Sequence, residues 1–224
     1  MRTVVLFSGG LDSTTVLALT IARGDEVFPL TLLYGQRHRV EVEKGRRILE
    51  RYGLADRART VTLDLSFLAS SSLTNTALGV PDNAADTIPN TYVPARNLVF
   101  LSLAAAYAED IGATRLAIGV NALDYSGYPD CRPEFVDAFN RTLAAGTKAG
   151  TAGGGIVVEA PLIDLTKREI VQLGRGLGVD HALTHSCYDP DEEGRACGVC
   201  DSCRLRLKGF AEAGLADPAP YRKP

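Results

Sequence analysis

A run of small and polar residues, FSGGLDSTT at residues 7–15, follows a short apolar segment near the start of the chain. Gly9 and Gly10 let the backbone approach an anion and leave N–H groups unpaired, and the dipole of a following helix favours negative charge there. Ser8 and Ser13 add hydroxyl donors, and Asp12 adds a carboxylate. A plain turn in which Asp12 or Ser13 caps the helix is the alternative, but a cap explains only one of these side chains. The run therefore predicts an anion-binding site.

The kind of anion follows from what the run contains and lacks. No lysine follows the glycines as in G-x-x-x-x-G-K-[ST], and the G-x-G-x-x-G pattern is absent, so the run itself carries no cation for a transferring γ-phosphoryl group. SGGLDS resembles the signature of the PP-loop ATP pyrophosphatases. That resemblance implies that a substrate oxygen attacks the α-phosphate of ATP, while the run holds the leaving pyrophosphate and places Mg²⁺. Asp12 and Ser13 are the predicted catalytic residues among the ATP-binding set of Phe7, Ser8, Gly9, Gly10, Leu11, Asp12, Ser13, Thr14 and Thr15.

Four of the five cysteines lie close together in the pattern C-x₉-C-x₂-C-x₂-C, in a segment of about residues 183–207. Two successive x₂ spacings let thiolates converge on one ion, and the last spacing suits one face of a helix. Four thiolates without a histidine close a tetrahedral site, which favours one structural Zn²⁺ per chain. A [4Fe–4S] cluster is the second interpretation, and disulfides are the third. The predicted metal ligands are Cys187, Cys197, Cys200 and Cys203.

Alternating strand and helix patterns must position these groups. The sequence predicts strands at residues 3–7, 26–34, 58–65, 115–120 and 156–162, and helices at 13–22, 40–52, 97–112, 133–145 and 166–178. This alternation predicts an α/β fold with a doubly wound, mostly parallel sheet that helices cover on both faces. Ligands in such folds bind beyond the carboxyl ends of the strands, where SGGLDS lies. Pro29 is expected at a bulge or an early edge, residues 66–97 in a functional loop, and the glycine-rich residues 145–155 in a flexible loop.

Composition fits one globular domain over residues 1–224, with 46% hydrophobic and 23% charged residues. The net charge of −3 gives no long-range attraction to a phosphate backbone, so nucleic acid is not an expected partner. No apolar run approaches the ~18–20 residues of a membrane helix, and the first residues do not resemble a signal peptide. We therefore expect a cytoplasmic protein that does not enter a membrane.

Six stretches spread over nearly the whole chain carry a closer resemblance: FSGGLDSTT, YGQRH (34–38), IPNTYVPARN (88–97), GYPDCRPEF (127–135), EAPL (159–162) and CGVCDSCRLR (197–206). In these stretches the sequence resembles the 7-cyano-7-deazaguanine synthases of the queuosine pathway, the QueC family. The resemblance implies the adenine nucleotide α-hydrolase-like fold of PP-loop enzymes, and a homodimer. Two residues depart from the family pattern: Leu11, where the family often has glutamine, and Ala95, where it usually has glycine. Leu11 is expected to face the core.

The resemblance also implies a reaction, in which 7-carboxy-7-deazaguanine, ammonia and two ATP give the nitrile preQ0. A carboxylate is a poor acyl donor, so adenylation makes AMP the leaving group. Ammonia then forms the amide, and adenylation of the amide oxygen allows elimination to the nitrile. The sequence shows no second domain for a glutaminase, so free ammonia is the expected nitrogen source. The alternatives are another PP-loop adenylating enzyme, such as a tRNA thiolase or lysidine synthase, or a zinc module that binds a partner.

Further ligand-binding residues are predicted from their places at the ends of elements. Arg96 and Asn97 stand where the polar loop meets a helix, and they are predicted to bind ATP phosphates or the substrate carboxylate, with Arg96 catalytic; capping of the helix is the alternative. A second group follows the second strand, where such folds hold nucleotides, although a solvated turn is possible there. This group, predicted to bind ATP, is Tyr34, Gln36, Arg37 and His38.

The deazapurine pocket is predicted around GYPDCRPEF. Tyr128, Asp130 and Arg132 are its candidate substrate-binding residues, with Asp130 accepting hydrogen bonds from the guanine-like N–H groups. Cys131 could be a covalent nucleophile in the same stretch. Buried cysteines are usually inert and adenylation needs no thiol, so no chemical role is predicted for it.

Overall fold

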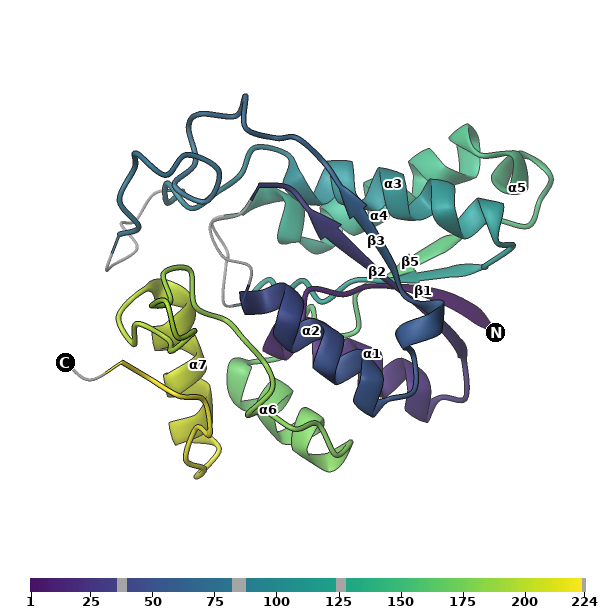
Figure 1. The fold of residues 1–224 in the computed structure, drawn as a ribbon. Helices are drawn as coiled ribbons and strands as arrows, with labels where there is room; N and C mark the ends of the chain where they lie inside the picture. The colour runs from purple at the N-terminus through teal and green to yellow at the C-terminus, as the bar shows by residue number, and fades with distance from the viewer. Residues whose placement is uncertain (36–39, 82–87, 124–127, 223–224) are drawn as a thin grey trace.

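A five-stranded parallel sheet forms the centre of the computed structural model, which describes residues 1–35, 40–81, 88–123 and 128–222. The strand order is β3-β2-β1-β4-β5, so the chain winds outward from β1 in both directions (Figure 1). The doubly wound parallel sheet predicted from the alternating pattern is thus confirmed. Its strands are β1 (Arg2–Leu6), β2 (Glu26–Leu33), β3 (Arg59–Thr62), β4 (Arg115–Ala117) and β5 (Val157–Glu159).

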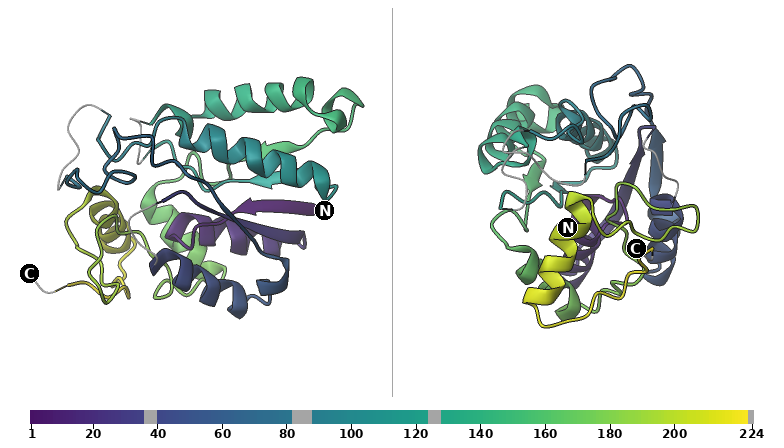
Figure 2. Two further views of the ribbon diagram at one scale, coloured as in Figure 1. Left: turned by 45° about the horizontal axis from the view of Figure 1, so that its top comes forward. Right: turned by 90° about the vertical axis from the view of Figure 1, so that its left-hand side faces the viewer.

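Helices cover both faces of the sheet, as the two views of Figure 2 show. On one face α3 (Arg96–Asp110) and α4 (Pro133–Gly146) bury an apolar cluster against the strands, with the short α5 (Lys148–Thr151) beyond them. The other face carries α1 (Leu11–Ala22), α2 (Val40–Arg51) and α6 (Lys167–Gly176), and α7 (Asp201–Glu212) joins the same cluster through Phe210. In the described residues, two 3₁₀ turns complete the elements, at Ala55–Arg57 and Pro129–Cys131.

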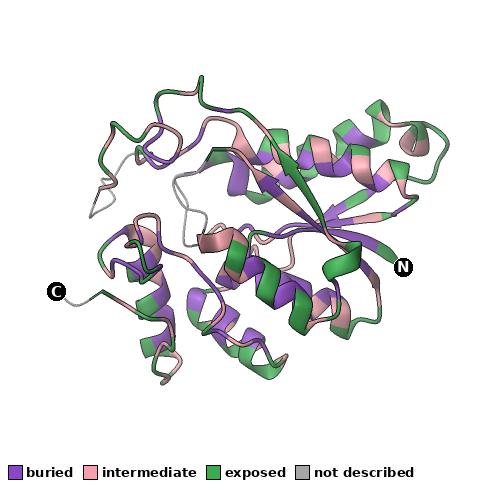
Figure 3. Cartoon of the chain, in the orientation of Figure 1, coloured by how far each residue is buried: buried purple, intermediate pink, exposed green. Residues whose placement is uncertain are grey.

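The centre and the edge of the sheet differ in exposure (Figure 3). Four of the five residues of β1 are buried, because this strand has a neighbour on each side and a helical layer on each face. All four residues of β3 are exposed at the edge. Strand order reverses at β1, and this is the point where doubly wound folds place their ligands. In Figure 1 the long loop after β3 and the C-terminal segment both lie near the carboxyl ends of the strands.

Pro29 lies within β2, yet the pairing register with β1 runs through it without a bulge. Its missing N–H faces the side of β3, because the carbonyl of Leu30 accepts from Phe7 on the opposite side. Pairing with β3 starts only at Leu30, so Pro29 stands at a local edge of the sheet and interrupts no hydrogen bond of the ladder.

The glycine-rich residues 145–155 are not simply a flexible loop, and that expectation was wrong for their middle part. Lys148–Thr151 form the helix α5, whose cap Thr147 accepts a hydrogen bond from the Gly150 N–H. A Cβ at Gly150 would lie 2.4 Å from the carbonyl oxygen of Leu143 on α4. A glycine is needed at position 150 because the backbones of α5 and α4 are in direct contact there.

None of the helices in the described part of the chain is long and apolar enough to cross a lipid bilayer.

Candidate active site and metal centre

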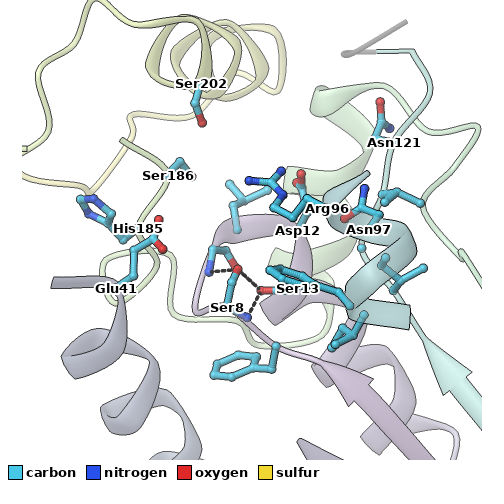
Figure 4. A pocket seen from close by; sticks show the side chains of 18 of the residues that line it. Ser8, Asp12, Ser13, Glu41, Arg96, Asn97, Asn121, His185, Ser186 and Ser202 are labelled. Atoms are coloured by element: carbon cyan, nitrogen blue, oxygen red, sulfur yellow. Dashed lines mark hydrogen bonds between the residues drawn. The ribbon is translucent and has the colours of Figure 1, made fainter. Parts of the chain in front are cut away.

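A cavity of about 300 Å³ lies at the carboxyl ends of β1, β2 and β4 (Figure 4). Parts of the chain that are far apart in sequence form its walls: residues 6–13, β2, the start of α3, residues 118–121, and residues 185–188 with α7. One wall is polar and is built by the SGGLDS run. The opposite wall is largely apolar and is lined by Leu30, Leu32, Phe100, Ile118, Val120 and Tyr128.

The SGGLDS run forms the tight strand-to-helix connection that its residue types predict. Gly9 has φ +81°, and a Cβ there would lie 2.9 Å from the Cα of Gly45 on α2, so both the conformation and the close approach require glycine. Ser8 and Ser13 share a hydrogen bond of 3.1 Å, and Ser8 Oγ also accepts from the Gly10 N–H. Gly10 is the N-cap of α1, and no side chain caps that helix. The plain-cap alternative for Asp12 and Ser13 therefore fails.

A lysine from the far end of the chain reaches this run. Lys167 Nζ lies 2.8 Å from both carboxylate oxygens of Asp12, 155 positions away in sequence, and only 8% of the lysine is exposed. Lys167 is the first residue of α6, whose start is fixed by a capping box between Thr166 and Glu169. The run carries no cation of its own, and the fold supplies one from another helix.

Gly9 packs its backbone against Gly45 and is not part of the cavity lining. The other predicted ATP-binding residues of the run divide into two groups. Phe7, Ser8, Gly10, Leu11, Asp12 and Ser13 line the cavity, and Leu11 also packs in the apolar cluster under α1, as expected. Thr14 and Thr15 lie on the buried side of α1, at 1% and 0% exposure, and are not part of the cavity lining. The Thr15 hydroxyl donates a hydrogen bond to the Leu11 carbonyl, so this buried polar group has a partner within its own helix.

Arg96 and Asn97 both line the cavity from the start of α3 (Figure 4). Arg96 Nη1 donates a hydrogen bond of 3.1 Å to the hydroxyl of Tyr34, and the guanidinium lies 5.8 Å from the centre of that ring. Tyr34 and Arg96 thus lie together next to the apolar wall, a contact that the sequence did not predict. Gln36, Arg37 and His38, predicted to bind ATP, lie outside the described residues.

The GYPDCRPEF stretch is only partly at the cavity. Tyr128 lines it, and its hydroxyl shares a hydrogen bond of 2.7 Å with Thr91. Asp130 is buried and accepts from the backbone N–H of Asn97 at 2.9 Å, while its carbonyl accepts from the Asn97 side chain. Arg132 is exposed at the start of α4, away from the cavity lining. Asp130 therefore holds the first turn of α3 in place.

Glu41 is a cavity residue that sequence reasoning missed. It lies in the first turn of α2 and lines the cavity beside Ser8. Burial raises the pKa of its carboxyl group to about 7, although the positive charge of Arg96 acts in the opposite direction. Other polar residues of the lining that the sequence analysis did not assign to the site are Thr31, Asn121, Lys167, His185, Ser186, Tyr188, Ser202 and Arg206. Asn121 and Lys167 come from stretches without a ligand-binding signal, whereas His185, Ser186, Ser202 and Arg206 lie within the cysteine segment, whose spacing indicated only a metal site.

The four clustered cysteines form a compact, buried site. Their sulfur atoms all lie within 4.8 Å of one another, and Cys197 Sγ is 3.9 Å from Cys203 Sγ. Sulfurs that bind one Zn²⁺ tetrahedrally at ~2.3 Å stand about 3.8 Å apart, so the donor set fits such an ion. Backbone N–H groups of Asp189 and Cys197 donate hydrogen bonds to Cys187 Sγ.

The cysteine site is joined to the cavity through α7. Cys200 caps this helix, and Ser202, Leu205 and Arg206 on it line the cavity. A Cβ at Gly209 would lie 2.4 Å from Lys167 Cγ, so α7 packs directly on the lysine that holds Asp12. Arg206 is buried and forms a paired salt bridge with Asp217, which fixes the last residues against the helix.

The comparisons with known proteins agree over the full chain. The family model of the queuosine biosynthesis protein QueC matches residues 2–214. The 7-cyano-7-deazaguanine synthase of Magnetococcus marinus is 56% identical over 227 residues, covering 100% of this chain and 98% of that protein. The enzyme of the same name from Pseudomonas aeruginosa strain LESB58 is 52% identical over 220 residues, with 98% of each chain covered. The chain belongs to the QueC family.

Solved structures share the fold of this QueC protein at low sequence identity. A 4-thiouridine synthetase in complex with RNA and ATP has a TM-score of 0.51 and 19% identity, over 95% of this chain and 50% of that one. The NMN synthetase of Francisella tularensis has a TM-score of 0.50 and 15% identity, over 96% and 77% of the two chains. These likenesses support the PP-loop type of fold predicted from SGGLDS.

One departure of this QueC protein from its family has a clear structural setting. Ala95 has φ 54°, and it is the only residue besides glycines with a positive φ in the described part of the chain. A left-handed conformation costs a non-glycine residue roughly 1–2 kcal/mol, a cost that the glycine expected from the family resemblance would not incur. The strained residue is the N-cap of α3, immediately before Arg96.

Replacement of Cys131 by serine is expected to leave the QueC protein folded, metal-loaded and active to within about threefold. Burial and the nearby Asp130 carboxylate raise the pKa of the Cys131 thiol to about 12, so it is protonated near neutral pH and is a poor nucleophile. Serine keeps a partner for the Asn97 amide, which donates to the sulfur at 3.4 Å. Nitrile formation and metal content should both be measured; loss of the nitrile with metal retained would point to a covalent role.

Proposed function

We propose that this protein converts 7-carboxy-7-deazaguanine and ammonia to 7-cyano-7-deazaguanine by two successive adenylations with ATP. One observation carries the proposal: a single cavity joins a pyrophosphate-type polar wall, with Lys167 on Asp12, to an apolar wall with tyrosine and phenylalanine rings. The polar wall suits the phosphates of ATP, and the apolar wall suits a flat aromatic heterocycle. The names of the relatives and the family support this substrate.

The SGGLDS run is proposed to bind the β- and γ-phosphates, which leave as pyrophosphate. The N–H groups at the start of α1 and the Ser8 and Ser13 hydroxyls can donate to phosphate oxygens. Lys167 can offset the charge that grows on the leaving group. MgATP is the co-substrate, and Asp12 can contact its Mg²⁺ and orient Lys167 at the same time.

Arg96 is proposed to bind the substrate carboxylate. Its planar guanidinium can hold a carboxylate through paired hydrogen bonds, and the hydrogen bond to Tyr34 fixes its position beside the apolar wall. Tyr128 and Asn97 border the same space. Asp130 and Arg132 are proposed to act indirectly, since the first positions α3 and the second starts α4.

Cys187, Cys197, Cys200 and Cys203 are proposed to hold one Zn²⁺ per chain. Four thiolates leave no open position on the ion, so the metal supplies structure rather than chemistry. Its effect at the cavity is to fix α7 and the residues that α7 contributes. A homodimer in the cytoplasm, with small-molecule substrates and no nucleic acid, completes the proposal and rests on the family resemblance and the net charge of −3.

Each nitrile is expected to appear with two AMP and two pyrophosphate, and without ADP. The acid oxygen and then the amide oxygen are bonded to the same carbon, so one bound ring can present each to the α-phosphate of a fresh ATP. Incubation with 7-carboxy-7-deazaguanine, ammonium and MgATP, followed by product mass and nucleotide analysis, tests the ratio.

The 7-amido compound provides the matched control. It should give the nitrile with one AMP and without added ammonium, because only the second adenylation remains. Formation of ADP, or an amide that accumulates and is never consumed, would contradict the adenylation mechanism.

A further inference from the structure

A second cavity of about 230 Å³ adjoins the first, between α2 and the β2–β3 side of the sheet. The two cavities share Ser8, Thr31, Glu41 and Val42 in their linings. At the other end of the second cavity, Arg46 and Thr60 are exposed. This space therefore connects the surface next to β3 with the polar wall of the active site.

The second cavity is large enough to admit a molecule of the size of water. Between its two ends lie small or aliphatic groups, among them Gly45, Leu49 and Ala58. Ammonia, which is about the size of a water molecule, can therefore enter it. The charge of Arg46 at the outer end is balanced by a salt bridge to Glu50.

Glu41 stands at the junction of the two cavities and is the acidic group there without an ion pair. Among the described residues that line either cavity, only Asp12 and Glu41 are acidic, and Lys167 occupies both oxygens of Asp12. No hydrogen bond or ion pair joins the Glu41 carboxylate to any residue in the described part of the chain. Figure 4 shows its side chain rising from the start of α2 toward the Ser8 run.

We propose that Glu41 binds the ammonium ion that enters through the second cavity and accepts a proton from it, so that neutral ammonia attacks the adenylated acid. The inference rests on the proposed function. A carboxylate without an ion partner at the junction of the two cavities attracts a small cation. A carboxyl group that titrates near pH 7 can both take up this proton and release it to water.

The step balances as follows. One N–H bond of ammonium breaks, its proton goes to a Glu41 oxygen, and the electron pair stays on nitrogen. That pair forms the C–N bond at the acyl carbon, the bond from this carbon to the AMP oxygen breaks, and a second proton passes from nitrogen to water. The products are the amide and AMP, and no oxidant or reductant takes part.

The Glu41→Gln variant tests the assignment through two half-reactions of one enzyme. With the acid, MgATP and ammonium, kcat/KM for ammonium should fall by about 10²-fold or more, the usual effect of losing a general base. With the 7-amido compound and MgATP, nitrile formation should stay within about threefold of wild type, because no ammonium is used. Acid-dependent exchange of pyrophosphate into ATP, measured without ammonium, should likewise persist. Glu43→Gln is the matched control, since Glu43 lies on the same helix but is exposed and paired with Arg47.

Equal losses in all three assays would overturn the inference, because Glu41 would then serve ATP or its Mg²⁺. An unchanged kcat/KM for ammonium would overturn it as well. If the wild-type enzyme makes no nitrile from either the acid or the amide, the proposed function itself fails, and that outcome is distinct from both.

A substitution at the outer end of the second cavity tests the entry route of ammonium without changing Glu41. Thr60→Phe on the exposed edge strand should raise KM for ammonium at least about fivefold and leave KM for ATP unchanged. Thr62→Phe is its control, because Thr62 is exposed on the same face of β3 but does not line the cavity. Equal KM values for ammonium in the two variants would contradict entry through this space.

Discussion

Turnover of the Lys167→Met enzyme is expected to fall by about 10²–10³-fold, the size of effect seen when one preorganised charge at a reacting centre is removed. Methionine keeps the apolar stem that packs against Gly209 and removes only the ammonium group. The fold and the metal content should therefore remain. Exchange of pyrophosphate into ATP should fall in parallel, because the lysine is proposed to act on the leaving pyrophosphate in both adenylations.

Lys148→Met is a suitable control for this change, since Lys148 lies in α5, far from the cavity lining. The decisive comparison is between the acid and the amide as substrates, and both should lose rate to the same extent. If turnover of Lys167→Met stayed close to wild type, the proposed phosphate-binding role of the Asp12–Lys167 pair would be wrong.

Loss of one cysteine ligand is expected to reduce the stability of the protein as well as its activity. Structural Zn²⁺ contributes roughly 10–16 kcal/mol in small modules, comparable with the whole stability of a typical domain. The Cys200→Ala chain should contain less than about one tenth of the wild-type metal and should aggregate or melt at a much lower temperature. Cys200 is buried at the start of α7, so loss of the ion also removes the cavity wall that this helix forms.

Elemental analysis of the purified protein, together with a thermal melt, measures both effects. Cys131→Ser serves as the control, because Cys131 is buried elsewhere and should leave the metal content unchanged. Wild-type protein is expected to be colourless with one zinc per chain. A brown protein that contains iron and labile sulfide would show that the cysteines bind an iron–sulfur cluster and not zinc. A metal-free Cys200→Ala chain with an unchanged melting temperature would contradict a structural role of the metal.

The sequence was sufficient for those parts of the site that are local. SGGLDS combines its glycines and hydroxyls within a few residues of one strand end, and the cysteine spacing places four sulfurs together, so neither needs knowledge of distant contacts. Lys167 could not be found in this way. A lysine at the first position of an amphipathic helix usually faces water, and only the packing of α6 against α1 and α7 brings it to Asp12.

Two other residues show why polar groups near a motif are difficult to assign. Asp130 looked like a base-recognition residue, but the first turn of α3 has unpaired N–H groups that need an acceptor, and Asp130 satisfies one of them. Glu41 follows YGQRH on a helix that carries several other charged residues, so its pattern gave no sign that it lines the cavity. Hydrophobic periodicity indicates burial only on average along an element, so it did not show where either of these two side chains lies.

The distance in sequence between Asp12 and Lys167 also sets the order of events in biogenesis. Synthesis at about 5–20 residues per second delays the lysine by roughly 8–30 s after the SGGLDS run has been made. In the same way, β1 can pair with β4 only after β4 has been synthesised, since residues 3–5 pair with residues 115–117. Such non-local pairing slows folding, because the loop must close before its contacts form. The proposed binding of ATP can therefore stabilise the protein only after Lys167 has been made, and nascent chains must reach that point without help from the nucleotide.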